Sequence, residues 1–275
     1  MKKYMIRCDM EGVSGIVSPE QAEPGRSEYA FGLNLFMTDL LALIEGLQEG
    51  GADEIHIFDE HYYGRNVDLA RIPKGVFVWC GKPAYTETWA GGLDNSFAGL
   101  ILLGIHAKEG TPGALLPHTY EPEILNMVLN GVPMGEIGVE AAVAGVLDVP
   151  LLLVTADSAG AAEAEALIPG VVTVAVKQAR EAHGGLCYPA SVTADWIRRA
   201  GRGIVENPPP VKPYRLSGAA TLEVEFRDTP FRAEMLKRLP PARRFPGVCV
   251  SGGNALEAYA KYWACKLESL SAANP

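Results

Sequence analysis

The chain has 275 residues and is acidic, with a formal net charge of −9, 48% hydrophobic residues and 21% charged residues. This composition is typical of a globular enzyme, and the length is sufficient for one large domain or two smaller ones. Because nucleic-acid binding needs a clustered basic surface, the acidic charge argues against a nucleic-acid partner. No stretch approaches the roughly 20 apolar residues of a membrane span, so we expect no membrane partner.

The expected compartment is the cytoplasm. Residues 1–7 are basic but lack the apolar stretch of a signal peptide. The five cysteines are an odd number without close pairing, which is typical of proteins kept in a reducing compartment.

The first 180 or so residues alternate between strand-like and helix-like segments. Strands are predicted at residues 4–6, 54–58, 75–79, 100–105, 150–155 and 171–176. Helices are predicted at residues 34–49, 138–146 and 159–167. This alternation predicts a three-layer α/β/α fold with a mostly parallel central sheet.

A hairpin is predicted in the middle of the chain. Residues 125–129 and 132–136 flank Asn130-Gly131, a dipeptide typical of a tight hairpin turn.

Three consecutive prolines, Pro208 to Pro210, form the clearest boundary in the chain. The segments predicted beyond it are strands at 221–226 and 248–251 and helices at 230–239 and 255–270. We therefore expect an α/β core over residues 1–205 and a smaller C-terminal α+β portion over residues 214–275, which can still pack as part of the same domain.

Side chains that can bind metal follow three of the predicted strands. Asp9 and Glu11 follow the first strand, His61 follows the second and His106 follows the fourth. Asp9 and Glu11 are two positions apart in an extended segment, so their side chains project to the same side. The carboxyl ends of neighbouring parallel strands line one crevice, where these residues should meet. The sequence therefore predicts a metal site.

Each position also has a simpler interpretation. An isolated Asp-x-Glu is more often part of a surface loop, and a lone histidine after a strand is more often solvated. His118 follows a turn-forming segment and could be a metal ligand, a general acid or base, or a plain loop residue. His56 lies within a strand and is expected to pack on a sheet face, whereas His183 lies in a glycine-containing loop.

Zinc fits mixed imidazole and carboxylate ligation, and manganese or cobalt accepts the same ligands. The ligands outnumber those of a usual single catalytic metal, so two ions that share a carboxylate are expected. Two metals about 3.5–4 Å apart could activate water and polarise a substrate carbonyl.

Six short motifs occur in the order found in one known family. They are Asp9 to Gly15, Asp59 to His61, Gly104 to Ala107, Thr111 to Gly113, Asn130 to Gly138 and Val174 to Gln178. Together they resemble the D-aminopeptidase family of dinuclear zinc metallopeptidases, and the C-terminal part is similar in length and pattern.

The resemblance implies an aminopeptidase that removes the N-terminal residue from short peptides, D-residue-containing ones in particular. It also implies a ring-shaped homo-oligomer. His118 would be the catalytic histidine. The ligands of two zinc ions, with the first aspartate bridging, would be Asp9, Glu11, His61, His106 and Glu136. The predicted hairpin would return the chain to the site and deliver Glu136 at a helix start.

Three features depart from the family pattern. Cys8 stands where a serine is common, and Glu60 replaces a small residue beside the ligand histidine. The loop from Gly113 to His118 is one residue longer than expected. Glu60 changes the charge near the metals and therefore bears on the substrate range.

Two other functions are compatible with parts of the pattern. A haloacid-dehalogenase-like phosphohydrolase also has an acid-x-acid pair after its first strand, but its magnesium site prefers oxygen ligands to imidazoles. The second alternative is a non-catalytic peptide-binding component of a transport system.

Overall fold

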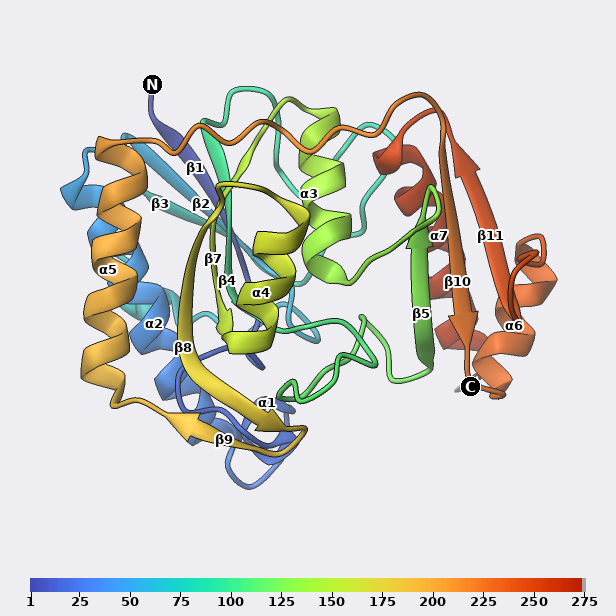
Figure 1. The fold of residues 1–275 in the computed structure, drawn as a ribbon, viewed down its shortest axis with the longest axis horizontal. Helices are drawn as coiled ribbons and strands as arrows, with labels where there is room; N and C mark the ends of the chain where they lie inside the picture. The colour runs from blue at the N-terminus through green and yellow to red at the C-terminus, as the bar shows by residue number, and fades with distance from the viewer. Residues whose placement is uncertain (274–275) are drawn as a thin grey trace.

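The computed structural model describes residues 1–273 and is built around a seven-stranded sheet (Figure 1). The strand order is β3-β2-β1-β4-β7-β8-β9, and every neighbouring pair is parallel except β8 and β9. The strands are β1 (Lys3–Cys8), β2 (Glu54–Asp59), β3 (Val76–Trp79), β4 (Gly99–Ile105), β7 (Leu151–Asp157), β8 (Val172–Glu181) and β9 (Gly184–Cys187).

Helices cover both faces of this sheet, so the predicted three-layer α/β/α architecture is confirmed. Helices α2 (Tyr29–Glu49) and α5 (Ala190–Glu206) cover one face, and α3 (Glu136–Val146) and α4 (Ser158–Leu167) cover the other. Along β1, Tyr4 and Ile6 pack with the first pair of helices, while Met5 packs on the opposite side. Both faces of the central strands are therefore buried, which explains their almost continuous apolar sequence.

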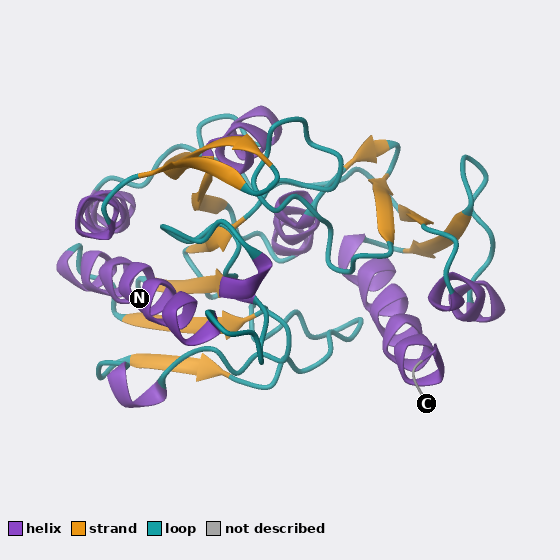
Figure 2. Ribbon diagram, turned by 90° about the horizontal axis from the view of Figure 1, so that it is seen from below, coloured by secondary structure: helices purple, strands orange, loops and turns teal. Residues whose placement is uncertain are grey.

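A second sheet lies to one side of the first (Figure 2). Its strands, all antiparallel, have the order β11-β10-β5-β6. They are β5 (Ile124–Leu129), β6 (Val132–Pro133), β10 (Ala220–Phe226) and β11 (Gly247–Gly252), accompanied by α6 (Pro230–Arg238) and α7 (Ala255–Ala273). Two short helices, α1 (Pro19–Ala22) and a 3-10 turn at Leu69–Arg71, complete the described chain.

The predicted hairpin is confirmed as β5 and β6. Its turn residues Asn130 and Gly131 have φ angles of 48° and 86°, the left-handed backbone that an Asn-Gly turn requires. Strand β5 also pairs with β10, so the hairpin belongs to the same sheet as the C-terminal strands. The division into residues 1–205 and 214–275 stays a prediction.

Helix α2 corrects one expectation. Its 21 residues are long and apolar enough to cross a membrane, which we did not expect of any segment. However, 56% of its apolar stretch is buried, and Phe36, Leu40 and Leu43 lie in the core beneath the sheet. Packing in the core therefore accounts for its hydrophobic sequence.

The contact between α2 and α5 depends on a glycine. A Cβ atom added to Gly46 would lie 2.0 Å from the carbonyl oxygen of Arg198, so only glycine permits this approach. We expect Gly46→Ala to lower the free energy of unfolding by about 1–3 kcal/mol, because the two helices must move apart. Urea denaturation would measure this loss.

Gly203 provides a matched control on α5. No atom lies within 4 Å of a Cβ added there, so Gly203→Ala should stabilise the protein by up to about 1 kcal/mol through helix propensity. Equal effects of the two substitutions would contradict the packing argument.

Candidate metal centre

The strand order brings the predicted site residues to one edge of the sheet. Strand β1 lies between β2 and β4, and its last residue, Cys8, is in register with Asp59 and Leu103. Strands β1 and β2 therefore end at the same level, and β4 continues to Ile105 at the same edge of the sheet. Asp9 and His106 follow their strands directly and His61 follows after Glu60, which is why residues far apart in sequence meet here.

Asp9 lies between two imidazole rings. Its Oδ1 atom is 2.7 Å from Nδ1 of His61, and its Oδ2 atom is 3.3 Å from Nε2 of His106. All three side chains are buried. One carboxylate thus connects two histidines that come from opposite neighbours of β1.

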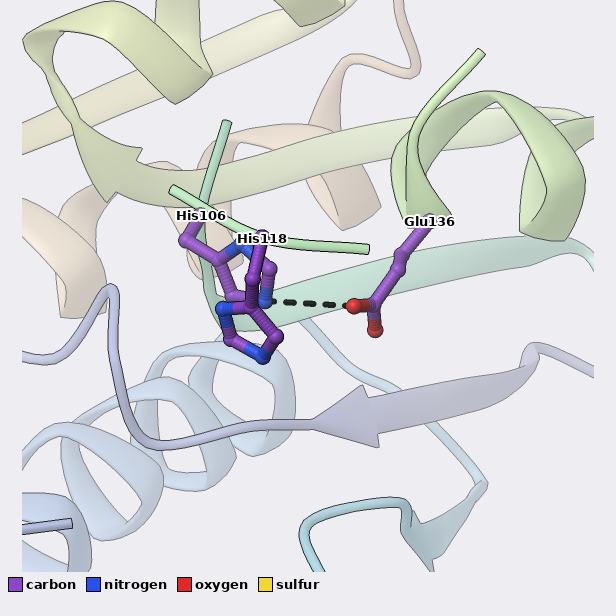
Figure 3. Close-up of side chains that lie close together, drawn as sticks. All are labelled: His106, His118 and Glu136. Carbon is purple, nitrogen blue, oxygen red and sulfur yellow. Dashed lines mark ion pairs between the residues drawn. The ribbon is translucent and has the colours of Figure 1, made fainter. Parts of the chain in front are cut away.

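Two groups of potential metal ligands surround this carboxylate. The first contains Asp9, Glu11 and His61, and the second contains His106, His118 and Glu136; within each group the ligand atoms lie within 4.8 Å of one another. In the first group, Glu11 Oε2 is 3.2 Å from His61 Nδ1. In the second, Glu136 Oε1 is 3.3 Å from His106 Nε2 (Figure 3).

Main-chain carbonyl groups orient the three histidines. The Nε2 atom of His61 lies 2.8 Å from the carbonyl oxygen of Ala22, and the Nδ1 atom of His106 lies 3.0 Å from that of Ala107. Each carbonyl can only accept, so we assign the proton to these outward nitrogens. When each ring is neutral, as a metal ligand must be, the inward nitrogens present lone pairs to the centre. The Nδ1 atom of His118 lies 3.0 Å from the carbonyl oxygen of Leu116 in the same manner.

Two inward atoms have no hydrogen-bonding partner within residues 1–273. They are Oε2 of Glu11 and Nε2 of His106, and both are fully buried. A buried polar atom without a partner is costly. Because both atoms are good metal ligands, the residues present fit a bound cation.

The protonation pattern also shows that positive charge is favoured here. Burial alone would raise the pKa of Asp9, but the adjacent imidazole rings of His106 and His61 hold it well below its usual range. Burial would likewise lower the pKa of His61, but the carboxylates of Glu11 and Asp9 raise it well above its usual value. Glu136 and Asp9 do the same for His106. Metal cations would supply the charge that protons otherwise provide.

Glu136 reaches the centre from the start of α3, which follows the hairpin of the second sheet. It is the first residue of α3, immediately after the β5–β6 hairpin, as predicted. Its Oε1 atom accepts a hydrogen bond of 2.7 Å from the backbone nitrogen of Tyr120. The hairpin and the loop before it therefore position this carboxylate together.

His118 is half-buried and stacks on His106. The ring centroids are 3.8 Å apart and the planes differ by 13°. The neighbouring residues Leu116 and Tyr120 have positive φ angles of 47° and 56°, an uncommon conformation for such side chains. The loop from Gly113 to His118 thus places His118 within the second ligand group.

The other histidines lie away from the centre, as expected. His56 packs on a sheet face, with ring centroids 5.2 Å from Phe77 and 5.3 Å from Phe97. His183 is exposed in the turn between β8 and β9.

Cys8, which precedes Asp9 in the chain, does not face the centre. Its thiol is directed to the carbonyl oxygen of Phe58 on β2.

Sequence reasoning did not identify the residue that holds the Asp9–Ile16 loop. The buried Nζ atom of Lys177 donates hydrogen bonds to the carbonyl oxygens of Glu11, Val13 and Ile16, at 2.5, 2.8 and 2.5 Å. Lys177 directly follows the apolar segment 171–176. A lysine at the end of a buried strand is the sequence signal that could have identified it. The loop also packs tightly at Gly12, where a Cβ would lie 1.8 Å from the carbonyl oxygen of Ile105.

The charge of Lys177 gives a pH prediction. Burial lowers its pKa from the ordinary 10.5 to about 8, although Asp157 opposes the shift. The unfolded chain therefore holds more protons between these two values, so the free energy of unfolding should rise with pH across that window. The rise attributable to Lys177 is roughly 3 kcal/mol.

Lys177→Met should lack this rise. Urea denaturation of both metal-free proteins at several pH values between 8 and 10.5 would isolate the contribution of Lys177 from that of other titrating groups. The same slope in both proteins would contradict the prediction. We also expect the variant to be less stable at pH 7, because three buried carbonyl groups lose their donor.

Comparison with known proteins agrees with this geometry. The sequence model of the D-aminopeptidase family (peptidase M55) matches residues 1–261. The D-aminopeptidase of Bacillus subtilis (strain 168) is 31% identical over 228 residues, covering 82% of this chain and 81% of that protein. The solved structure of the Zn-dependent D-aminopeptidase DppA from Bacillus subtilis, described as a self-compartmentalizing protease, covers 98% of each chain with a TM-score of 0.91 and 26% identity. The chain therefore belongs to the D-aminopeptidase family.

Proposed function

We propose that this protein is a zinc-dependent aminopeptidase that removes the N-terminal residue from short peptides, D-residue-containing ones in particular. The observation that carries the proposal is the contact of Asp9 with both His61 and His106, at 2.7 and 3.3 Å. A carboxylate that offers one oxygen to each of two ligand groups suits a pair of metal ions. The family membership supports peptide hydrolysis at such a site.

The proposed ligand set divides between two ions. Glu11 and His61 would hold one zinc ion, His106 and Glu136 would hold the other, and Asp9 would bridge them. The donor set of imidazole and carboxylate fits zinc. It also fits manganese or cobalt.

His118 is the proposed catalytic residue. When bound, the zinc ions would lower the pKa of a water molecule and polarise the scissile carbonyl. His118 lies beside this position, stacked on His106, and its Nε2 atom faces away from its carbonyl partner. It would donate a proton to the leaving amine or stabilise the tetrahedral intermediate.

The two alternatives have less support. A phosphohydrolase of the haloacid-dehalogenase type uses magnesium, which prefers oxygen ligands, whereas both ligand groups here contain histidine. A non-catalytic peptide-binding role leaves no task for His118 beside a complete set of metal ligands.

We also propose a cytoplasmic, ring-shaped homo-oligomer. Support for assembly comes from the similar solved structure, which is described as self-compartmentalizing. A ring would limit access to short peptides. All five cysteines lie within the described residues as free thiols, which suits a reducing compartment.

The metal content of variants tests the ligand assignment. The wild-type protein should bind two zinc ions per chain, and Asp9→Asn should bind fewer than one, because Asp9 is shared by both ions. Elemental analysis after gel filtration would measure this. Glu54→Gln, which removes a carboxylate from the opposite end of β2, should keep both ions; full zinc content in Asp9→Asn would refute the bridging role.

His118→Ala tests the catalytic assignment. We expect kcat to fall about 10²- to 10⁴-fold, the usual contribution of a general acid or base, while the zinc content stays unchanged. Hydrolysis of D- and L-alanyl p-nitroanilide, beside a phosphate ester, would measure activity and stereochemical preference. His183→Ala removes an exposed histidine and should behave as wild type. Wild-type turnover by His118→Ala would exclude this role.

A further inference from the structure

A small aromatic cavity lies beside the metal centre. The residues that line it include Glu60, Lys82, Tyr85, Tyr120, Glu136 and Trp263. Its volume is about 10 Å³. This is about the space that one water molecule needs. The cavity therefore admits one small group and excludes a bulky side chain.

The cavity shares a wall with the proposed zinc site. Glu136 lines the cavity and also lies 3.3 Å from Nε2 of His106. Tyr120, another lining residue, donates its backbone N–H to the same carboxylate. Glu60 immediately precedes His61 in the chain. A group held in the cavity is thus next to the position where the scissile carbonyl would bind.

The walls of the cavity favour a cation. Aromatic faces and carboxylates both attract positive charge. Two ammonium groups of the protein already lie over the Trp263 ring, Nζ of Lys82 at 5.3 Å and Nζ of Lys266 at 4.2 Å. Lys266 is buried and forms an ion pair with Glu121, whereas Lys82 is partly exposed.

Glu60 is the acidic group of this cavity that is not a proposed metal ligand. Its Oε1 atom accepts a hydrogen bond of 2.8 Å from the Tyr85 hydroxyl and lies 3.6 Å from Nε of Arg7. The same guanidinium forms an ion pair with Glu140 and donates to the carbonyl oxygen of Ala90. Arg7 is therefore shared between two carboxylates, and Lys82, which also lines the cavity, is the other cation close to Glu60.

We propose that the aromatic cavity binds the α-ammonium group of the substrate's N-terminal residue and that Glu60 is its counter-ion. This inference rests on the proposed aminopeptidase function. Only Cα separates the α-nitrogen from the first carbonyl carbon, so the two atoms are about 2.5 Å apart. Fixing the ammonium beside Glu136 places that first carbonyl at the metal centre. Cleavage then occurs one residue from the end of the peptide.

This role makes Glu60 a specificity-determining residue for substrates with a free amino terminus. The size of the cavity matches an ammonium group and does not match a large side chain.

Glu60→Gln tests the assignment with two substrates of the same shape. D-alanyl-p-nitroanilide carries the α-ammonium, and propionyl-p-nitroanilide lacks it. Wild type should strongly prefer the first. In the variant, KM for the first substrate should rise about 10- to 100-fold, the usual range for losing a charged hydrogen bond. The zinc content and kcat should stay within a few-fold of wild type.

Glu140→Gln is the matched control. It removes the other carboxylate partner of Arg7 but does not line the cavity, so it should lower the melting temperature without changing KM. An equal rise of KM in Glu140→Gln would overturn the proposal. So would loss of zinc or of kcat in Glu60→Gln with KM unchanged, because Glu60 would then act through His61.

Competition by methylammonium chloride provides a second test that needs no variant. It should inhibit the wild-type protein competitively, whereas potassium chloride at the same ionic strength should not. Equal effects of the two salts would overturn the proposal. If zinc-replete wild type hydrolyses no aminoacyl anilide at all, the aminopeptidase function itself fails, which is a different result.

Discussion

The centre of this molecule depends on one carboxylate held between two imidazoles. Asp9 keeps its place because β1 lies between β2 and β4 and all three strands end at the same edge of the sheet. The loop after β1 then turns so closely over β4 that Gly12 leaves no room for a Cβ. Lys177 completes the arrangement by holding three carbonyl groups of that loop. Backbone packing therefore determines the ligand geometry before any metal binds.

Much of this arrangement could be predicted from sequence because parallel strands buried on both faces have a recognisable apolar pattern. The positions of Asp9, His61 and His106 followed from that pattern and the rule that strand ends converge. Glu136 did not, since nothing local distinguishes it from the other acidic residues. Its place in the centre depends on a hairpin that belongs to the second sheet, and only the family resemblance pointed to it.

Other elements could not be predicted because their role depends on partners distant in sequence. The pairing of β5 with β10 joins residues about 100 positions apart, and the proline-rich boundary gives no indication of it. Helix α5 was not predicted because charged residues and glycines interrupt its apolar residues, although Ile197 and Ile204 form a buried stripe against α2. The buried position of Lys177 likewise becomes clear only when the loop that it binds is in place.

The histidines are oriented by the carbonyl oxygens of Ala22, Ala107 and Leu116. Substitution can delete a side-chain acceptor, but every residue type carries a main-chain carbonyl. The tautomers of these histidines therefore depend on the backbone fold, and no single substitution at the carbonyl-bearing residues removes the acceptor. Substitutions can instead change the side chains that line the site. Relatives can therefore diverge in the substrates that they bind while the catalytic residues stay the same.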